Sequence, residues 1–270
     1  MKNFALRMKE LRTAAGFSQD TAAKKLNISL PTYCRYEYDQ REPNASTIAR
    51  IAQLYQVSVD YLFGLDNPGP EPTVNIILAS NSPRRRELLG QMGVTDFQVS
   101  APNVDESVED GLSPAQIVEQ LSLRKALAVA KKAGPNDLVI AADTVVALDG
   151  AVLGKPRNEA GAFAMLSALS GREHHVYTGV TVHRAGRTVT GHEETAVTFR
   201  ALEADEIRGY IGTGEPMDKA GAYGIQGLGA LLVSGIRGDY CNVVGLPVFR
   251  LGRILKEFGV DLLSRSAEPS

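Results

Sequence analysis

IILASNSPRRRELL, residues 76–89, joins an apolar run to hydroxyl residues, one proline and three arginines. The run predicts a buried strand, and the segment after it has the spacing of a helix. Ser82 suits the N-cap and Pro83 the first helical position, where the missing N–H of proline would be unpaired anyway. The other first-turn N–H groups and the helix dipole attract anions, and we expect the three arginines to converge on the same point. We therefore predict a polyphosphate site at this helix start; a capped surface helix with a solvated basic run is the alternative.

The composition is that of a folded protein without a strong charge bias. Of 270 residues, 44% are apolar and 22% charged, and the net charge of −2 favours neither nucleic acid nor a membrane as a general partner. We find no apolar run near the length of a membrane span, and the first residues have helical spacing instead of a signal-peptide core. Cys34 and Cys241 fit neither a metal site nor a disulfide framework, so we expect a protein of the reducing cytoplasm.

Residues 1–67 have the pattern of a small all-α domain. Phe4, Met8 and Leu11 recur at helical spacing, and Ser18 and Ser29 can cap the second and third of five short helices. A tight turn between those two helices predicts a helix-turn-helix. The domain holds 9 Lys and Arg against 7 Asp and Glu, a net charge of +2. This charge is small for a strong phosphate-contacting surface.

These residues resemble the Cro/repressor-type (XRE) helix-turn-helix family. The resemblance depends on LRTAAGFSQDTAA at residues 11–23, Tyr36-Glu37, Pro43 and Tyr61-Leu62. It implies binding to double-stranded DNA, normally as a homodimer, through Gln19, Ser29, Thr32 and Arg35. Leu30 and Pro31 depart from the family pattern, because they offer no hydrogen bonds where polar readers are usual. A helical bundle used for dimerisation or for binding another partner is the alternative.

A proline-rich segment separates this domain from the rest of the chain. Pro68, Pro70 and Pro72 fall within residues 68–73, and such a segment is extended and semi-rigid with no core of its own. We therefore predict a linker at 68–73 and a second domain at 74–263.

Asp143 lies inside the most apolar segment of the second domain, residues 138–148. That segment predicts a strand covered on both faces. An acid there is costly unless it meets a partner, a metal or a ligand. An acid bonded to backbone at a strand end is the alternative. Asp149-Gly150 predicts a hairpin turn after the strand, from which Lys155 could reach back toward Asp143.

Other polar residues of the domain could complete a site with Asp143. Glu106 follows Asp105 in a paired-acid loop, and Lys125 lies on a long predicted helix at about 113–133. Residues 214–229 contain five glycines together with Asp218, Lys219 and Gln226. We predict a loop there whose backbone comes near a ligand; an idle flexible loop is the alternative. Carboxylates for Mg²⁺ and lysines for charge neutralisation fit hydrolysis at a phosphoanhydride.

Several motifs in this order resemble the Maf family of nucleoside triphosphate pyrophosphatases. They are Ala79-Ser80-x-Ser82-Pro83-Arg84-Arg85, Asp105-Glu106, Ala142-Asp143-Thr144-Val145, Gly154-Lys155-Pro156 and DKAGAYGIQG at 218–227. The resemblance implies a two-lobed α/β domain with a mixed sheet and a central cleft, related to the inosine triphosphate pyrophosphatase-like fold. It also implies hydrolysis of a nucleoside triphosphate to the monophosphate and pyrophosphate with a divalent metal, Mg²⁺ or Mn²⁺.

The resemblance assigns roles to individual residues. It implies that Asp143 is the proton acceptor that activates water. From the carboxylates themselves we expect Asp143 and Glu106 to hold the metal, with Asp105 or Asp218 as alternative ligands. Arg84, Thr144 and Gln226 match the positions that select dTTP and UTP, with modified uridine triphosphates as further substrates. The remaining polar cleft positions of the family match Ser80, Ser82, Arg85, Glu106, Lys125, Lys155, Asp218 and Lys219. Arg124 departs from the family, which often has Glu there, so the metal affinity could differ. The alternative is a nucleotide-sensing transcription regulator with a weakly active Maf-like domain.

Overall fold

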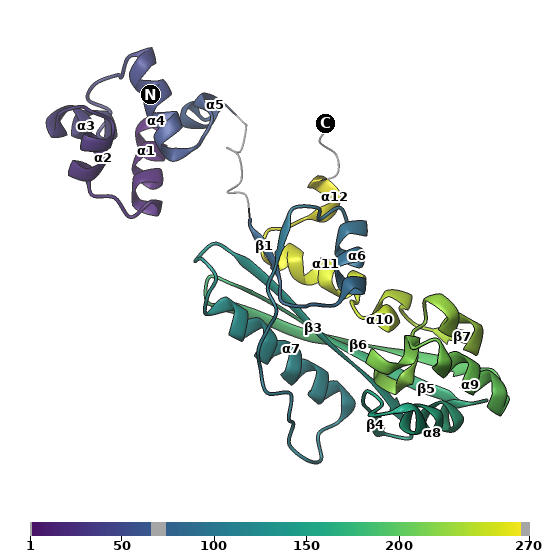
Figure 1. Ribbon diagram of the computed structural model, residues 1–270. Helices are drawn as coiled ribbons and strands as arrows, with labels where there is room; N and C mark the ends of the chain where they lie inside the picture. The colour runs from purple at the N-terminus through teal and green to yellow at the C-terminus, as the bar shows by residue number, and fades with distance from the viewer. Residues whose placement is uncertain (1, 66–73, 266–270) are drawn as a thin grey trace. The chain divides into compact units, whose positions relative to one another are not determined.

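The computed structural model describes residues 2–65 and 74–265 (Figure 1). The chain divides into two compact units, Met1–Val74 and Asn75–Ser270, and each is described by itself. The linker predicted at 68–73 lies outside the described residues. Among the described helices, none combines the length and the apolarity needed to cross a bilayer.

The first unit is a bundle of short helices, as the sequence predicts. They are α1 (Lys2–Ala14), α2 (Gln19–Lys25), α3 (Leu30–Glu37), α4 (Ala45–Tyr55) and α5 (Val59–Phe63). Ser18 caps α2 by accepting a hydrogen bond from the backbone N–H of Thr21, and Ser29 caps α3 through that of Thr32. The apolar faces meet in a core that contains Met8, Tyr33 and Leu62, each with no exposed surface.

The second unit is built on one seven-stranded mixed sheet, with strands in the order β2-β1-β3-β5-β6-β7 and β4 paired to β3. The strands are β1 (Ile76–Leu78), β2 (Phe97–Val99), β3 (Leu138–Leu148), β4 (Ala151–Leu153), β5 (Glu173–Arg184), β6 (Arg187–Phe199) and β7 (Val233–Arg237). β1 runs parallel to β2 and β3, whereas the other pairs are antiparallel. The predicted Asp149-Gly150 turn is confirmed between β3 and β4, and both residues have positive φ.

Helices cover both faces of this sheet. They are α6 (Pro83–Gln91), α7 (Pro114–Ala130), α8 (Glu159–Leu169), α9 (Ala204–Gly212), α10 (Tyr240–Val244), α11 (Val248–Glu257) and α12 (Leu262–Arg265). Figure 1 shows α7 along the opposite side of the sheet from α6, α10 and α11. The glycine-rich segment is more regular than the predicted loop, since it forms the 3₁₀ turns η1 (Glu215–Asp218), η2 (Ala220–Ala222) and η3 (Gly227–Leu232).

Gly179 on β5 lets α7 approach the sheet closely. A Cβ atom at this position would lie 2.2 Å from the carbonyl oxygen of Val118 on α7. This distance is too short for two atoms that are not bonded, so only glycine fits here. Gly179 is the antiparallel partner of Asp143 on β3. The close approach therefore brings polar residues of α7 onto the sheet beside Asp143.

Candidate active site

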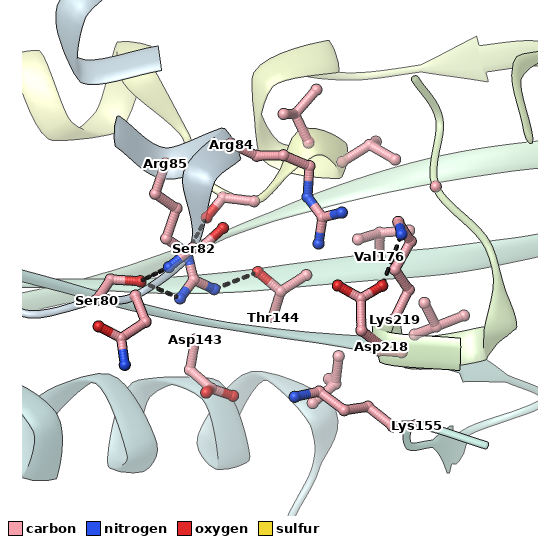
Figure 2. Close-up of a pocket in the computed structure, with 18 of the residues that line it drawn as sticks. Ser80, Ser82, Arg84, Arg85, Asp143, Thr144, Lys155, Val176, Asp218 and Lys219 are labelled. Atoms are coloured by element: carbon pink, nitrogen blue, oxygen red, sulfur yellow. Dashed lines mark hydrogen bonds and ion pairs between the residues drawn. The ribbon is translucent and has the colours of Figure 1, made fainter. Parts of the chain in front are cut away.

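A cavity of about 700 Å³ collects the polar residues predicted for the second domain (Figure 2). Its lining includes Ser80, Ser82, Arg84, Arg85, Glu106, Lys125, Asp143, Thr144, Lys155, Asp218, Lys219 and Gln226. The residues come from the start of α6, the loop before α7, α7 itself, β3, and the segments after β4 and α9. Asp143 and the serine–arginine turn thus share one cavity.

The start of α6 differs from the prediction in how it is capped. Ser82 occupies the N-cap position, but its hydroxyl makes no capping hydrogen bond. Instead, the backbone N–H of Ser82 donates to Ser80 Oγ over 3.2 Å. The predicted N-cap position of Ser82 and first-turn position of Pro83 are therefore confirmed, but the hydroxyl does not cap the helix. The consequence is a first turn of α6 without a side-chain cap, facing the cavity with a half-buried Ser82.

Arg85 lies in the wall of the cavity, where other groups of the protein hold its guanidinium. Its Nε donates to the carbonyl oxygen of Gly245 (2.8 Å), Nη1 to Ser80 Oγ (3.3 Å) and Nη2 to Thr144 Oγ1 (3.1 Å). Burial lowers the pKa of this guanidinium, and the negative charge of Asp143 opposes that effect. Arg85 therefore joins the segment after β1, strand β3 and the segment after α10, with most of its donors already used by the protein.

Arg84 is oriented differently. Within the described residues its guanidinium makes no hydrogen bond or ion pair, and Figure 2 shows it extending into the cavity on the side of Asp218. Arg86 is exposed and does not line the cavity. The expectation that all three arginines converge is thus wrong for Arg86, because successive helical residues point in different directions. Arg84 is the arginine whose donors remain available to a ligand.

Asp143 on β3 has an ionic partner on α7. Lys125 Nζ lies 2.5 Å from Asp143 Oδ1 and 2.7 Å from Glu106 Oε1, so one ammonium joins both carboxylates. The hydrogen bond from Lys125 lowers the pKa of Glu106 against the opposing effect of burial. Within the described part of the chain, Asp143 Oδ2 accepts no hydrogen bond. One oxygen of Asp143 is therefore held while the other is open to the cavity.

The loop before α7 separates the roles of its two acids. Asp105 is exposed and accepts from the backbone N–H and the hydroxyl of Ser107 (2.9 and 2.7 Å), whereas Glu106 lines the cavity. Arg124 donates to the carbonyl oxygens of Asp105 and Ser107 and does not line the cavity. Arg124, which departs from the family pattern, thus holds the loop that carries Glu106 through hydrogen bonds to its backbone.

Cationic and amide groups from two further segments lie on the opposite wall. Lys219 Nζ lies 2.6 Å from Asp218 Oδ1, and this contact lowers the pKa of Asp218. Lys155 is exposed at the cavity edge. Gln226 is half-buried, and its amide has no hydrogen-bond partner within the described residues. Lys155 and Gln226 therefore present free donors to anything that enters the cavity, whereas Lys219 already donates to Asp218 and to the main-chain oxygen of Glu215.

Sequence reasoning missed the residues that hold Thr144. Its hydroxyl lies 2.9 Å from that of Thr178 on β5, and Thr178 in turn donates to the carbonyl oxygen of Asn242. The side chain of Asn242 is fully buried and donates to Val176 O and Thr195 Oγ1. Threonine in an alternating strand is an ordinary β residue, so no local signal could have identified this support.

The predicted DNA-contacting residues lie around the start of α2 and on α3. Ser29 and Arg35 are exposed and Thr32 is half-buried, but the Ser29 hydroxyl is already shared with Thr32 (2.8 Å). Gln19 is tied inside the domain, because its Nε2 donates to Glu37 Oε2 (2.8 Å) and its Oε1 accepts from Cys34 Sγ. Within the described residues Arg35 has no side-chain partner, so it is the most available of these groups.

The fold and this cavity agree with comparisons to known proteins. Residues 75–258 match the family described as Maf-like protein, and residues 8–62 match the helix-turn-helix family. The chain is 56% identical over 193 residues to a dTTP/UTP pyrophosphatase of Moorella thermoacetica, which covers 70% of this chain and 98% of that relative. It is 52% identical over 192 residues to the protein of the same name from Symbiobacterium thermophilum, covering 71% of this chain and 98% of the relative. The family match covers most of this chain, and the motifs that resemble the family gather on one cavity. The protein therefore belongs to the Maf-like protein family and carries a helix-turn-helix domain ahead of its Maf-like domain.

Proposed function

We propose that the Maf-like domain hydrolyses dTTP and UTP, together with modified uridine triphosphates, to the monophosphate and pyrophosphate. The observation that carries this proposal is the shared cavity, in which a cationic, uncapped helix start faces a buried carboxylate with one open oxygen. The dTTP/UTP pyrophosphatases at 56% and 52% identity support the choice of substrate.

The triphosphate binds at the start of α6 in this proposal. Backbone N–H groups at the uncapped first turn and the Ser82 hydroxyl suit phosphate oxygens, as at other helix N-termini. Arg84 adds a guanidinium that can bind phosphate in bidentate fashion, and Lys155 and Lys219 add point charges from the facing wall. Thr144 and Gln226, with Arg84, supply the side chains that choose the nucleotide.

Asp143 acts as the general base. Lys125 holds Oδ1, so Oδ2 accepts a proton from the water that attacks the α-phosphorus. A bond forms between the water oxygen and the α-phosphorus, and the bond from that phosphorus to the bridging oxygen breaks, releasing pyrophosphate. Lys125 keeps its position through Glu106. These steps use only residues of this chain and water.

The carboxylates also fit a divalent cation, Mg²⁺ or Mn²⁺. Asp143 and Glu106 offer hard oxygen atoms on one cavity, and Mg²⁺ commonly binds one or two carboxylates together with substrate phosphates. Within the described residues no cluster of three or more His, Cys, Asp or Glu could hold a metal ion, so the further ligands would be nucleotide phosphates and water. A cation bound there would neutralise charge on the phosphates.

Pyrophosphate release from a panel of nucleoside triphosphates tests the proposal. With Mg²⁺, dTTP and UTP should be the preferred substrates, and Asp143→Asn should lower kcat by about 1,000-fold, within the range for losing a general base. Asp137→Asn is a matched control, because Asp137 bonds Gly134 and Asn75 away from the cavity. Tight nucleotide binding without release would instead favour a nucleotide-sensing transcription regulator.

We propose further that the first domain binds double-stranded DNA as a homodimer. The exposed Arg35 on α3 and the match to the helix-turn-helix family support this role. The free thiols of Cys34 and Cys241 support residence in the reducing cytoplasm. The enzyme would then act beside the DNA that its first domain binds.

A further inference from the structure

The carboxylate of Glu215 organises the glycine-rich segment beside the cavity. Its Oε1 accepts from the hydroxyl of Tyr210 (2.9 Å) and from the backbone N–H of Gly229 (3.1 Å). Its Oε2 accepts from the backbone N–H of Leu228 (3.1 Å). Both amides belong to η3, which begins directly after Gln226. One side chain therefore fixes the backbone that follows Gln226.

Tyr210 fixes the backbone that precedes Gln226. Its hydroxyl oxygen accepts from the N–H of Gly224 over 3.2 Å while the same group donates to Glu215. Burial alone would raise the pKa of Glu215, but the hydrogen bonds from Tyr210, Gly229 and Leu228 outweigh it, and the pKa is lowered. The ionised carboxylate is thus the form that fits this set of donors.

The turn around Gln226 depends on glycine as well. Gly227 has φ +66°, and a Cβ atom there would lie 2.8 Å from Glu215 Oε2. A Cβ atom on Gly229 would lie 2.1 Å from the carbonyl oxygen of Gly224. A side chain at position 227 would therefore meet the Glu215 carboxylate, and one at position 229 would meet the backbone of Gly224, so the turn is built for glycine at both positions.

Gln226 relies on this turn for its position. Its amide has no hydrogen-bond partner within the described residues, although it lines the cavity. Glu215 does not line the cavity, so it would not touch the nucleotide. The backbone at Gln226 sets which part of the cavity its amide can reach, and Glu215 and Tyr210 hold that backbone on both sides.

We propose that Glu215 is a positioning residue for nucleobase recognition, acting through the turn that presents Gln226. The inference deepens the proposed function and rests on it. The phosphate side of the site is separable from this role, because the hydrogen bond that Lys219 Nζ makes to Glu215 goes to its main-chain oxygen. A substitution of the Glu215 side chain therefore leaves that contact with Lys219 in place.

Glu215→Gln tests the proposal with two kinetic constants. The substitution replaces one acceptor oxygen by an NH₂ group, which cannot accept a hydrogen bond from a backbone N–H. We expect KM for UTP to rise about tenfold, the effect of losing one hydrogen bond to a charged group. We expect kcat and the inhibition constant of inorganic tripolyphosphate, which has no base, to stay within about twofold of wild type.

Two further variants make the result decisive. Tyr210→Phe should raise KM for UTP in the same direction, and it replaces Glu215→Gln as the test if the Glu215 variant does not fold. Glu193→Gln is the matched control, since Glu193 bonds Arg250 outside the cavity, and its KM should not change. An unchanged KM in folded Glu215→Gln, or equal changes for UTP and tripolyphosphate, overturns the role of Glu215. Failure of the wild-type protein to release pyrophosphate would instead count against the proposed function.

Discussion

Asp143 on β3 pairs with Gly179 on β5, and the absent side chain of Gly179 makes room for the helix that carries the partner of Asp143. The Val118 carbonyl would lie 2.2 Å from a Cβ at position 179. Lys125, about two turns further along α7, reaches Asp143 Oδ1 at 2.5 Å. The ion pair in the proposed active site therefore depends on a helix–sheet distance set at a glycine.

Gly179→Ala should move α7 away from the sheet. We expect a loss of about 1–3 kcal/mol in unfolding free energy, as for other overpacked sites, and a lower kcat because Lys125 moves with the helix. Thermal unfolding and pyrophosphate release measure the two effects. Gly235→Ala is the control, because a Cβ on this β7 residue would meet nothing within 4 Å. Unchanged stability of Gly179→Ala would contradict the packing argument.

Lys125→Met should affect metal binding and turnover in opposite directions. Removing the ammonium leaves Asp143 and Glu106 without the cation that now joins them, so Mn²⁺ should bind the nucleotide-free protein more tightly, as followed by electron paramagnetic resonance. We expect kcat to fall by about 100-fold, the effect of removing one positioned charge from an active site. Lys131→Met, at the C-cap of α7, should change neither quantity. Weaker Mn²⁺ binding in Lys125→Met would show that the carboxylates are not the metal ligands.

The helix-turn-helix domain should lose stability in acid through Glu37. Burial raises the pKa of Glu37, but hydrogen bonds from Arg12 and Gln19 outweigh this effect, and the folded-state pKa lies below the ordinary value of 4.5. Stability from the ionised carboxylate is therefore present above about pH 4.5 and is lost as the pH falls through the lower folded-state pKa. The difference in Tm between wild type and Glu37→Gln should be largest at neutral pH and shrink below pH 4.5 in calorimetry.

The exposed Glu10 provides the comparison for this experiment. Glu10→Gln removes the same charge from the same domain without touching Arg12 or Gln19. Its Tm should follow the wild-type curve at every pH. A constant difference between wild type and Glu37→Gln from pH 7 to pH 3 would exclude the ion pair as the source of the acid sensitivity.

Arg35→Ala should weaken DNA binding by the first domain. Fluorescence anisotropy with a duplex at low salt should show binding that weakens as salt is raised, and the variant should lose about tenfold in affinity. Lys9→Ala, an exposed change on α1, should bind as wild type. A flat titration of the wild-type protein at low salt would remove the DNA-binding proposal.

Most of the polar residues assigned to the cavity came from the resemblance to the Maf family, whereas the sequence itself predicted both domains and many of the helix starts. These features depend on local patterns: hydroxyl caps at Ser18 and Ser29, the apolar run around Asp143, and turn residues such as Asp149-Gly150. Such patterns are sufficient because backbone preference and burial periodicity act between neighbouring residues. Ser82 occupies the predicted N-cap position, but local patterns did not show that its hydroxyl leaves the helix backbone unbonded.

Only the tertiary structure decided what each polar group does. Arg85 and Arg84 are neighbours with the same side chain, yet one bonds Gly245, 160 residues away, and the other is left free for a ligand. The same holds for three further residues, because each contacts a segment that is distant in sequence or packed by the fold: Glu215, Gly179 and Asn242. The physical reason is that a hydrogen bond depends on distance and direction in space, which sequence spacing specifies within a turn or a helix but not between distant segments.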